Sequence, residues 1–165
     1  MLLSSGLGST GLLLVKSMLN RPAQALVEPS IPDLGGDIPV QVPLAIDAQL
    51  AAADILSNGG VVLCDRDIVD SGFLIRQSQV PVVPVSVFVD TGHGRVHPWV
   101  RQPPALRTRV NVYFGQARLV SEVELPDASQ GGEVRVVRYV SEWSRQVVAD
   151  HQEMVLQRMG GEAAQ

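Results

Sequence analysis

The sequence has little cysteine, few aromatic residues and no cluster of positive charge. Cys64 is the single cysteine in 165 residues, so no disulfide can form within the chain, and a reducing compartment is expected. The formal net charge is −4, and the 13 basic residues form no stripe, which argues against a nucleic-acid surface. No apolar run reaches the roughly 18 to 20 residues of a membrane span, and residues 1–6 lack the charge of a signal peptide. We therefore expect a cytoplasmic protein, peripheral at most to the inner face of the membrane.

The sequence contains enough apolar residues for one folded domain. Apolar residues make up 45% of the chain, which at this length supports a single core and one domain over residues 1–165. Apolar spacing and terminating residues predict helices over 12–19, 45–56 and 133–159. Strands are expected at 1–5, 23–27, 38–42, 61–64, 80–89 and 107–114, with a loop over 29–37. Helices that alternate with apolar strands predict an α/β fold.

Some details of these elements can also be predicted. The first helix has Ser9 or Thr10 as its candidate N-cap. The valine-rich run at 80–89 is typical of a strand covered on both faces, although its prolines suggest an edge position or an irregular start. The long C-terminal helix should pack its apolar stripe on the core. His151, on its polar side, is expected to be exposed to solvent.

The block at residues 61–72 is the stretch around which the chain is organised. A buried strand ends there in Asp65, Arg66 and Asp67, and ligands of open α/β sheets bind just past the carboxyl ends of strands. These charges are candidates for the rim of a cleft, or for a solvated turn in which they pair with each other. Cys64 could act as a nucleophile beside Arg66, but a buried structural cysteine is the better interpretation.

A glycine pattern near the N-terminus suggests a second kind of site. Gly6, Gly8 and Gly11 open a helix, and Glu28 ends the next strand, as in the dinucleotide fingerprint. Only residues 1–5 precede the pattern, and no regular series of βα units follows it. Nucleotide binding therefore stays an alternative that rests on a weak motif.

The order of landmarks along residues 4–155 resembles the glycerophospholipid acyltransferase family. It is most similar to the acyltransferase half of the bacterial 2-acylglycerophosphoethanolamine acyltransferases. Residues 80–85, Val-Pro-Val-Val-Pro-Val, match that family's VPVVPV block, and residues 61–72 are similar in length and framing to its phosphate-site block, φφφFPEGxR…G. Residues 37–41 resemble the short strand after which the family places Asp-Arg, and residues 21–31 the stretch after its catalytic helix. The resemblance implies a mixed sheet flanked by helices, shortened at its N-terminus, with a long C-terminal helix.

The catalytic signature of that family, NHxxxxD, is altered here. Its histidine acts as general base on the acceptor hydroxyl, and its aspartate orients the imidazole. Ser5 stands at the position of the base and Thr10 at that of the orienting group. A serine hydroxyl cannot take up a proton near neutral pH, so the family's mechanism is not available to these residues.

The substrate-binding positions implied by the resemblance are altered as well. Cys64, Asp65 and Arg66 stand in place of the family's Pro-Glu-Gly, and Asp67 stands at its arginine position. Gln41 stands where the Asp-Arg pair begins. The connection from Gly72 to Val80 is expected to be short, where the family has a helix. The apolar framework is kept while the polar positions change, as in a domain that kept its fold and lost its chemistry.

No metal site or cofactor is expected from the remaining residues. His93 and His97 lack a third partner at a convincing spacing. The most direct hypothesis is a catalytically silent acyltransferase-like domain of phospholipid metabolism that binds a lipid, an acyl donor or a protein partner. The acyl donor would be acyl-CoA or acyl-carrier protein, and the partner could be a second copy of the chain. The alternatives are an active acyltransferase with a non-standard base, and a nucleotide-binding domain.

Overall fold

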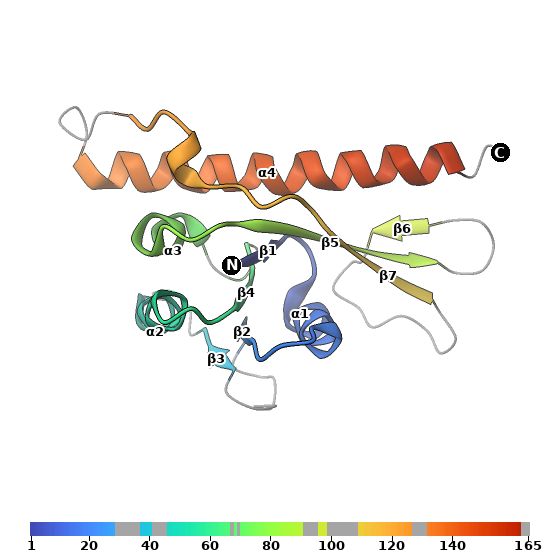
Figure 1. Ribbon diagram of the computed structural model, residues 1–165, viewed down its shortest axis with the longest axis horizontal. Helices are drawn as coiled ribbons and strands as arrows, with labels where there is room; N and C mark the ends of the chain where they lie inside the picture. The colour runs from blue at the N-terminus through green and yellow to red at the C-terminus, as the bar shows by residue number, and fades with distance from the viewer. Residues whose placement is uncertain are drawn as a thin grey trace.

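A mixed sheet flanked by helices forms the centre of the computed structural model (Figure 1). The structure describes residues 1–28, 37–40, 46–66, 68, 70–90, 96–98, 109–126 and 132–162. Its elements in chain order are β1 (Leu2–Ser4), α1 (Gly8–Met18), β2 (Gln24–Val27), β3 (Ile38–Pro39), α2 (Ile46–Ser57), β4 (Val62–Asp65), α3 (Ser71–Ser78), β5 (Val83–Asp90), β6 (Val96–Pro98), β7 (Arg109–Phe114), the 3-10 turn η1 (Val120–Glu122) and α4 (Gly132–Glu162).

The described strands follow the order β3-β2-β4-β1-β5, and these five run parallel. β6 and β7 add antiparallel to β5, one on each side of its second half. The predicted α/β fold, its mixed sheet and its long C-terminal helix are thereby confirmed. Residues 29–36 and 41–45, which include most of the predicted loop and the end of the third predicted strand, lie outside the described residues.

The prolines of β5 suggest either an edge position or an irregular start, and the structure shows the irregular start. The strand pairs with β1 through Val83 and Pro84 on one side and with β7 on the other, so it is no edge strand. Its start is irregular, because Val82 makes an isolated bridge with Arg118 ahead of the strand. Pro84 has no N–H to donate, but its carbonyl oxygen accepts from the Gly115 N–H at 2.8 Å.

The two faces of the sheet carry two separate apolar cores. α2, α3 and α4 cover one face, where Leu3 and Cys64 point into the larger core. α1 covers the other, where Leu63 and Val85 pack against it. Figure 1 shows α4 and α1 on opposite sides of β5. Side chains alternate along a strand, so Asp65, next to Cys64, belongs on the α1 face.

The helix α3 occupies the connection that the sequence predicts to be short and without the helix of the acyltransferase family. Asp70 caps it, its carboxylate accepting from the Gly72 N–H at 2.9 Å, and Gln79 ends it in the left-handed region at φ 53°. A Cβ at Gly72 would lie 2.6 Å from the Val137 carbonyl oxygen of α4, so the glycine permits close packing of the two helices. The expectation of a non-helical connection is wrong because this contact, which the local sequence does not reveal, stabilises an eight-residue helix.

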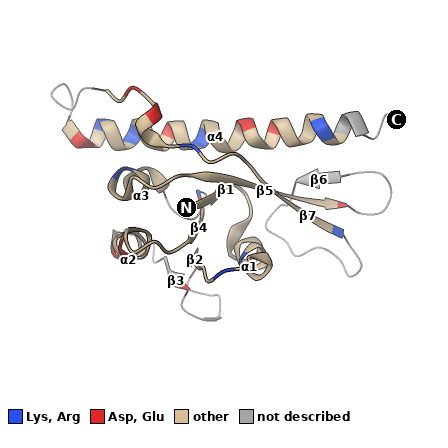
Figure 2. Ribbon diagram, in the orientation of Figure 1, with Lys and Arg blue, Asp and Glu red and all other residues tan. Residues whose placement is uncertain are grey.

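The helix α4 packs its apolar stripe on the larger core, as predicted, and carries charged residues of both signs along its length (Figure 2). Val136, Val140, Val148 and Val155 are buried on its inner side. Among the described residues, no helix has both the length and the apolar character that crossing a membrane requires.

Candidate functional site

The carboxyl ends of β1 and β4 meet at one edge of the sheet. Ser4 and Asp65 are register partners there, and the Arg66 N–H donates to the Ser4 carbonyl oxygen at 3.1 Å. The Asp65 carbonyl oxygen in turn accepts from the Ile68 N–H at 2.9 Å. Ser5, Asp65 and Arg66 therefore lie at the end of adjacent strands, as the sequence predicts. Gln41 and Asp67, the other two polar candidates, lie outside the described residues.

The Asp65 side chain does not line an open rim, because it is fully buried. Its Oδ2 atom accepts from the Gly8 N–H at 2.7 Å, at the first residue of α1. The N-terminus of a helix presents unpaired N–H groups and partial positive charge, and a carboxylate satisfies both. Asp65 thus caps α1 from a neighbouring strand.

The predicted N-caps of α1, Ser9 and Thr10, are therefore wrong. The helix begins at Gly8, and Leu7 at the N-cap position makes no side-chain hydrogen bond. The hydroxyl of Ser9 instead accepts from the Glu28 N–H at 2.8 Å, tying α1 to the end of β2. Thr10 points away from the core and is exposed.

The hydrogen bond between Gly8 and Asp65 also bears on the glycine pattern of residues 6, 8 and 11. Gly6 and Gly8 have positive φ angles of 76° and 62°, so the loop needs glycine for its backbone shape. A phosphate at this helix N-terminus would have to displace the buried Asp65 carboxylate, which repels it. The site that a nucleotide pyrophosphate would need is thus occupied by the chain itself, and the geometry argues against nucleotide binding.

The catalytic positions implied by the resemblance do not form a dyad. Ser5 is half-buried and Thr10 is exposed, and no hydrogen bond between the two hydroxyls is present in the described part of the chain. Cys64 is fully buried, and burial raises the pKa of its thiol far above the usual value, with the charges of Asp65 and Asp70 adding to the effect. The reactive form of cysteine is the thiolate, so Cys64 is a core residue and no nucleophile.

His151 is the one histidine whose side chain the structure describes, and it differs from its expected position. It is only 6% exposed, and its Nε2 atom lies 3.2 Å from the Tyr113 carbonyl oxygen. Since a carbonyl oxygen can only accept, Nε2 carries the proton. The prediction of a solvent-exposed residue is wrong because α4 lies against β7 and its flanking residues at this turn. The imidazole is thus engaged with the backbone of β7, and no hydrogen bond joins it to Ser5 within the described residues.

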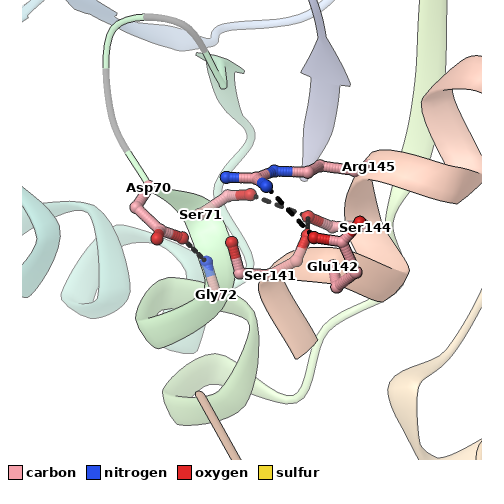
Figure 3. A network of polar contacts seen from close by, with 7 residues as sticks. All are labelled: Asp70, Ser71, Gly72, Ser141, Glu142, Ser144 and Arg145. Atoms are coloured by element: carbon pink, nitrogen blue, oxygen red, sulfur yellow. Dashed lines mark hydrogen bonds and ion pairs between the residues drawn. The ribbon is translucent and has the colours of Figure 1, made fainter. Parts of the chain in front are cut away.

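A small polar hollow lies on the α4 side of the same edge (Figure 3). It has a volume of about 40 Å³, and Arg66 lines it together with a serine cluster formed by Ser71, Ser141 and Ser144. The Ser71 and Ser144 hydroxyl oxygens are 3.2 Å apart, and Ser144 donates to the Ser141 carbonyl oxygen at 2.8 Å. This space suits about one water molecule. The serine cluster joins α3 to α4 and leaves no room for a substrate.

A larger hollow lies at the opposite edge of the sheet, where no sequence motif points. It has a volume of about 490 Å³ and lies at the amino ends of β1, β4 and β5. We call it the apolar hollow; its walls include Leu2, Leu19, Leu56, Val61, Val83 and Phe114. Arg21 is the one charged side chain in its lining. No local pattern signals this site, because its walls come from segments far apart in the sequence.

Neither a metal-ligand cluster nor a known relative assigns a function to these residues. No group of three or more His, Cys, Asp or Glu residues in the described ranges could hold a metal ion. Compared with protein-family models, with curated proteins and with solved structures, the chain has no match. The resemblance to acyltransferases rests on the sequence residues that carry it.

Replacing Asp65 by Ala should destabilise the protein more than removing the cap of α3. The Asp65→Ala variant leaves the buried Gly8 N–H without an acceptor, which costs about 2–3 kcal/mol. Asp70→Ala, at an exposed cap, should cost about 1 kcal/mol. Urea unfolding followed by circular dichroism measures both free energies. Equal losses would contradict a structural role for the buried carboxylate.

Cys64 should be inert to thiol reagents in the folded protein. Because its pKa is raised, the thiol stays protonated at slightly alkaline pH, and burial blocks access to it. Ellman's reagent should react with it only at the rate of unfolding in buffer, and rapidly in concentrated urea. Fast labelling of the native chain would show that the strand β4 is open at this edge.

Proposed function

We propose that this chain is an acyltransferase-like domain without catalytic activity, which binds an acyl chain instead of transferring it. The resemblance of residues 61–72 and 80–85 to the acyltransferase family supports the assignment of class. The helix α3, at the place where that family has one, adds to this support.

Two features of the carboxyl edge support the loss of catalysis. The carboxylate that remains there, Asp65, is engaged with the N-terminus of α1 and is closed to solvent. The side chain at the position of the base is Ser5, and the described imidazole, His151, is bonded to the Tyr113 carbonyl oxygen. General base catalysis needs a group that can take up a proton within hydrogen-bond reach of the acceptor hydroxyl.

The observation that carries the binding role is the apolar hollow. Its volume of about 490 Å³ is within the range of small-molecule pockets, roughly 300–1,000 Å³. Burying each methylene group of an acyl chain there would contribute about 0.8 kcal/mol. A chain of moderate length is therefore a ligand that this lining favours over a polar metabolite.

The first test is acyl transfer with acyl-CoA or acyl-carrier protein as donor and lysophospholipids as acceptors. We expect no turnover above background, because no base is placed at Ser5. The Ser5→Ala variant should behave in the same way. Turnover that survives this substitution would contradict the proposal and would favour an active enzyme with a base from elsewhere, beginning with His93 and His97.

The second test is binding of a fluorescent fatty-acid analogue. Phe114, which is 47% exposed, forms part of the wall of the apolar hollow, so Phe114→Gln should weaken binding by about fivefold through lost apolar contact. Leu156→Gln is the matched control, since Leu156 is 40% exposed on α4 and does not line this hollow. Equal effects of the two substitutions, or no binding by the unmodified chain, would contradict an acyl site here.

A further inference from the structure

A second hollow adjoins the apolar one and differs from it in character. It has a volume of about 400 Å³ and shares Arg21, Gly60 and Val61 with its neighbour. Lys16 and Gln24 line it as well, so we call it the basic hollow. The two together form a continuous surface that is apolar at one end and cationic at the other.

The charge of Arg21 is the uncompensated one in this surface. No Asp or Glu is among the residues that line either hollow. Lys16 is paired, its Nζ atom lying 2.5 Å from Oδ1 of Asp37. The Arg21 side chain, by contrast, is exposed to solvent and makes no hydrogen bond or ion pair within the described residues. Its guanidinium can therefore bind the negative group of a ligand without losing a partner in the chain.

A polar side chain near Arg21 is also incompletely bonded. The Oε1 atom of Gln24 is buried and has no hydrogen-bond partner among the described residues. An amide oxygen is an acceptor and does not bind an anion, so the recognition of an oxyanion in the basic hollow falls to Arg21.

We propose that the two hollows bind a single-chain amphiphile with an anionic head, its chain in the apolar hollow and its carboxylate or phosphate on Arg21. This inference rests on the proposed function, and it places the ligand at the amino edge of the sheet. The carboxyl edge, where the resemblance implies substrate binding, is closed by Asp65.

The test is calorimetric titration of the full chain with three twelve-carbon compounds below their micellar concentrations. Dodecanoate and dodecyl phosphate carry an anionic head, and dodecyltrimethylammonium carries a cationic one. The two anions should bind at least about tenfold more tightly than the cation, a difference of about 1.4 kcal/mol. If only dodecyl phosphate shows this preference, the head is a phosphate; if both anions show it, the head site accepts either oxyanion.

The matched variants are Arg21→Gln and Arg118→Gln, which remove the same charge. Arg118 lines a different hollow, beside His151. Arg21→Gln should weaken the two anions about tenfold and leave the cation unchanged, while Arg118→Gln should change neither. Circular dichroism and urea unfolding confirm that both variants are folded.

The outcomes separate this inference from the proposed function. Binding of all three compounds with equal affinity, or an unchanged affinity in Arg21→Gln, would overturn the anionic head site and leave an acyl-binding domain. A loss in Arg21→Gln without a loss in Phe114→Gln would place the chain elsewhere and overturn the two-hollow site. No binding of any compound would overturn both proposals.

Discussion

The buried carboxylate of Asp65 is the contact on which the arrangement of the sheet edge depends. It lies at the end of β4 and accepts a hydrogen bond from the first residue of α1, so one side chain fixes the helix to the strand next to β1. A buried carboxylate needs partners of this kind, because its transfer from water is otherwise highly unfavourable. This hydrogen bond leaves the Asp65 carboxylate closed to a ligand. It also fills the N-terminus of α1, where an anion would otherwise bind.

The consequence is that the open volume of the domain lies at the edge of the sheet opposite to the usual one. Ligands of α/β sheets are commonly bound at the carboxyl ends of the strands. Here that edge is filled on one face by Asp65 and on the other by the serine cluster between α3 and α4. The open volume lies at the amino ends, where apolar side chains and Arg21 meet. Charge and shape therefore favour a different ligand position from the one that sequence motifs imply.

Much of the fold follows from local patterns in the sequence. The helices at 45–56 and 133–159 are predicted correctly because their buried residues repeat with the helical period, and the strand at 61–64 because it is a short apolar run that is buried on both faces. The helix α3 is missed since its stability depends on Gly72 packing against α4, a contact across more than sixty residues of sequence. The burial of His151 is also not predicted, for a related reason. Its side of α4 is polar in sequence but faces β7, where its imidazole has a backbone carbonyl as partner.

By itself, the sequence determined the fold class, the burial of Cys64 and the position of Asp65 and Arg66 at the carboxyl end of a strand, because these depend on periodicity and on strand direction. Only the tertiary structure decided what those residues do. Whether a carboxylate at a strand end is open to a ligand or caps a helix depends on which helix lies over it, and residues 8 and 65 are joined only in space. The two hollows at the amino edge have the same origin, since their walls come from α1, α2 and four strands whose order in the sheet no local pattern specifies.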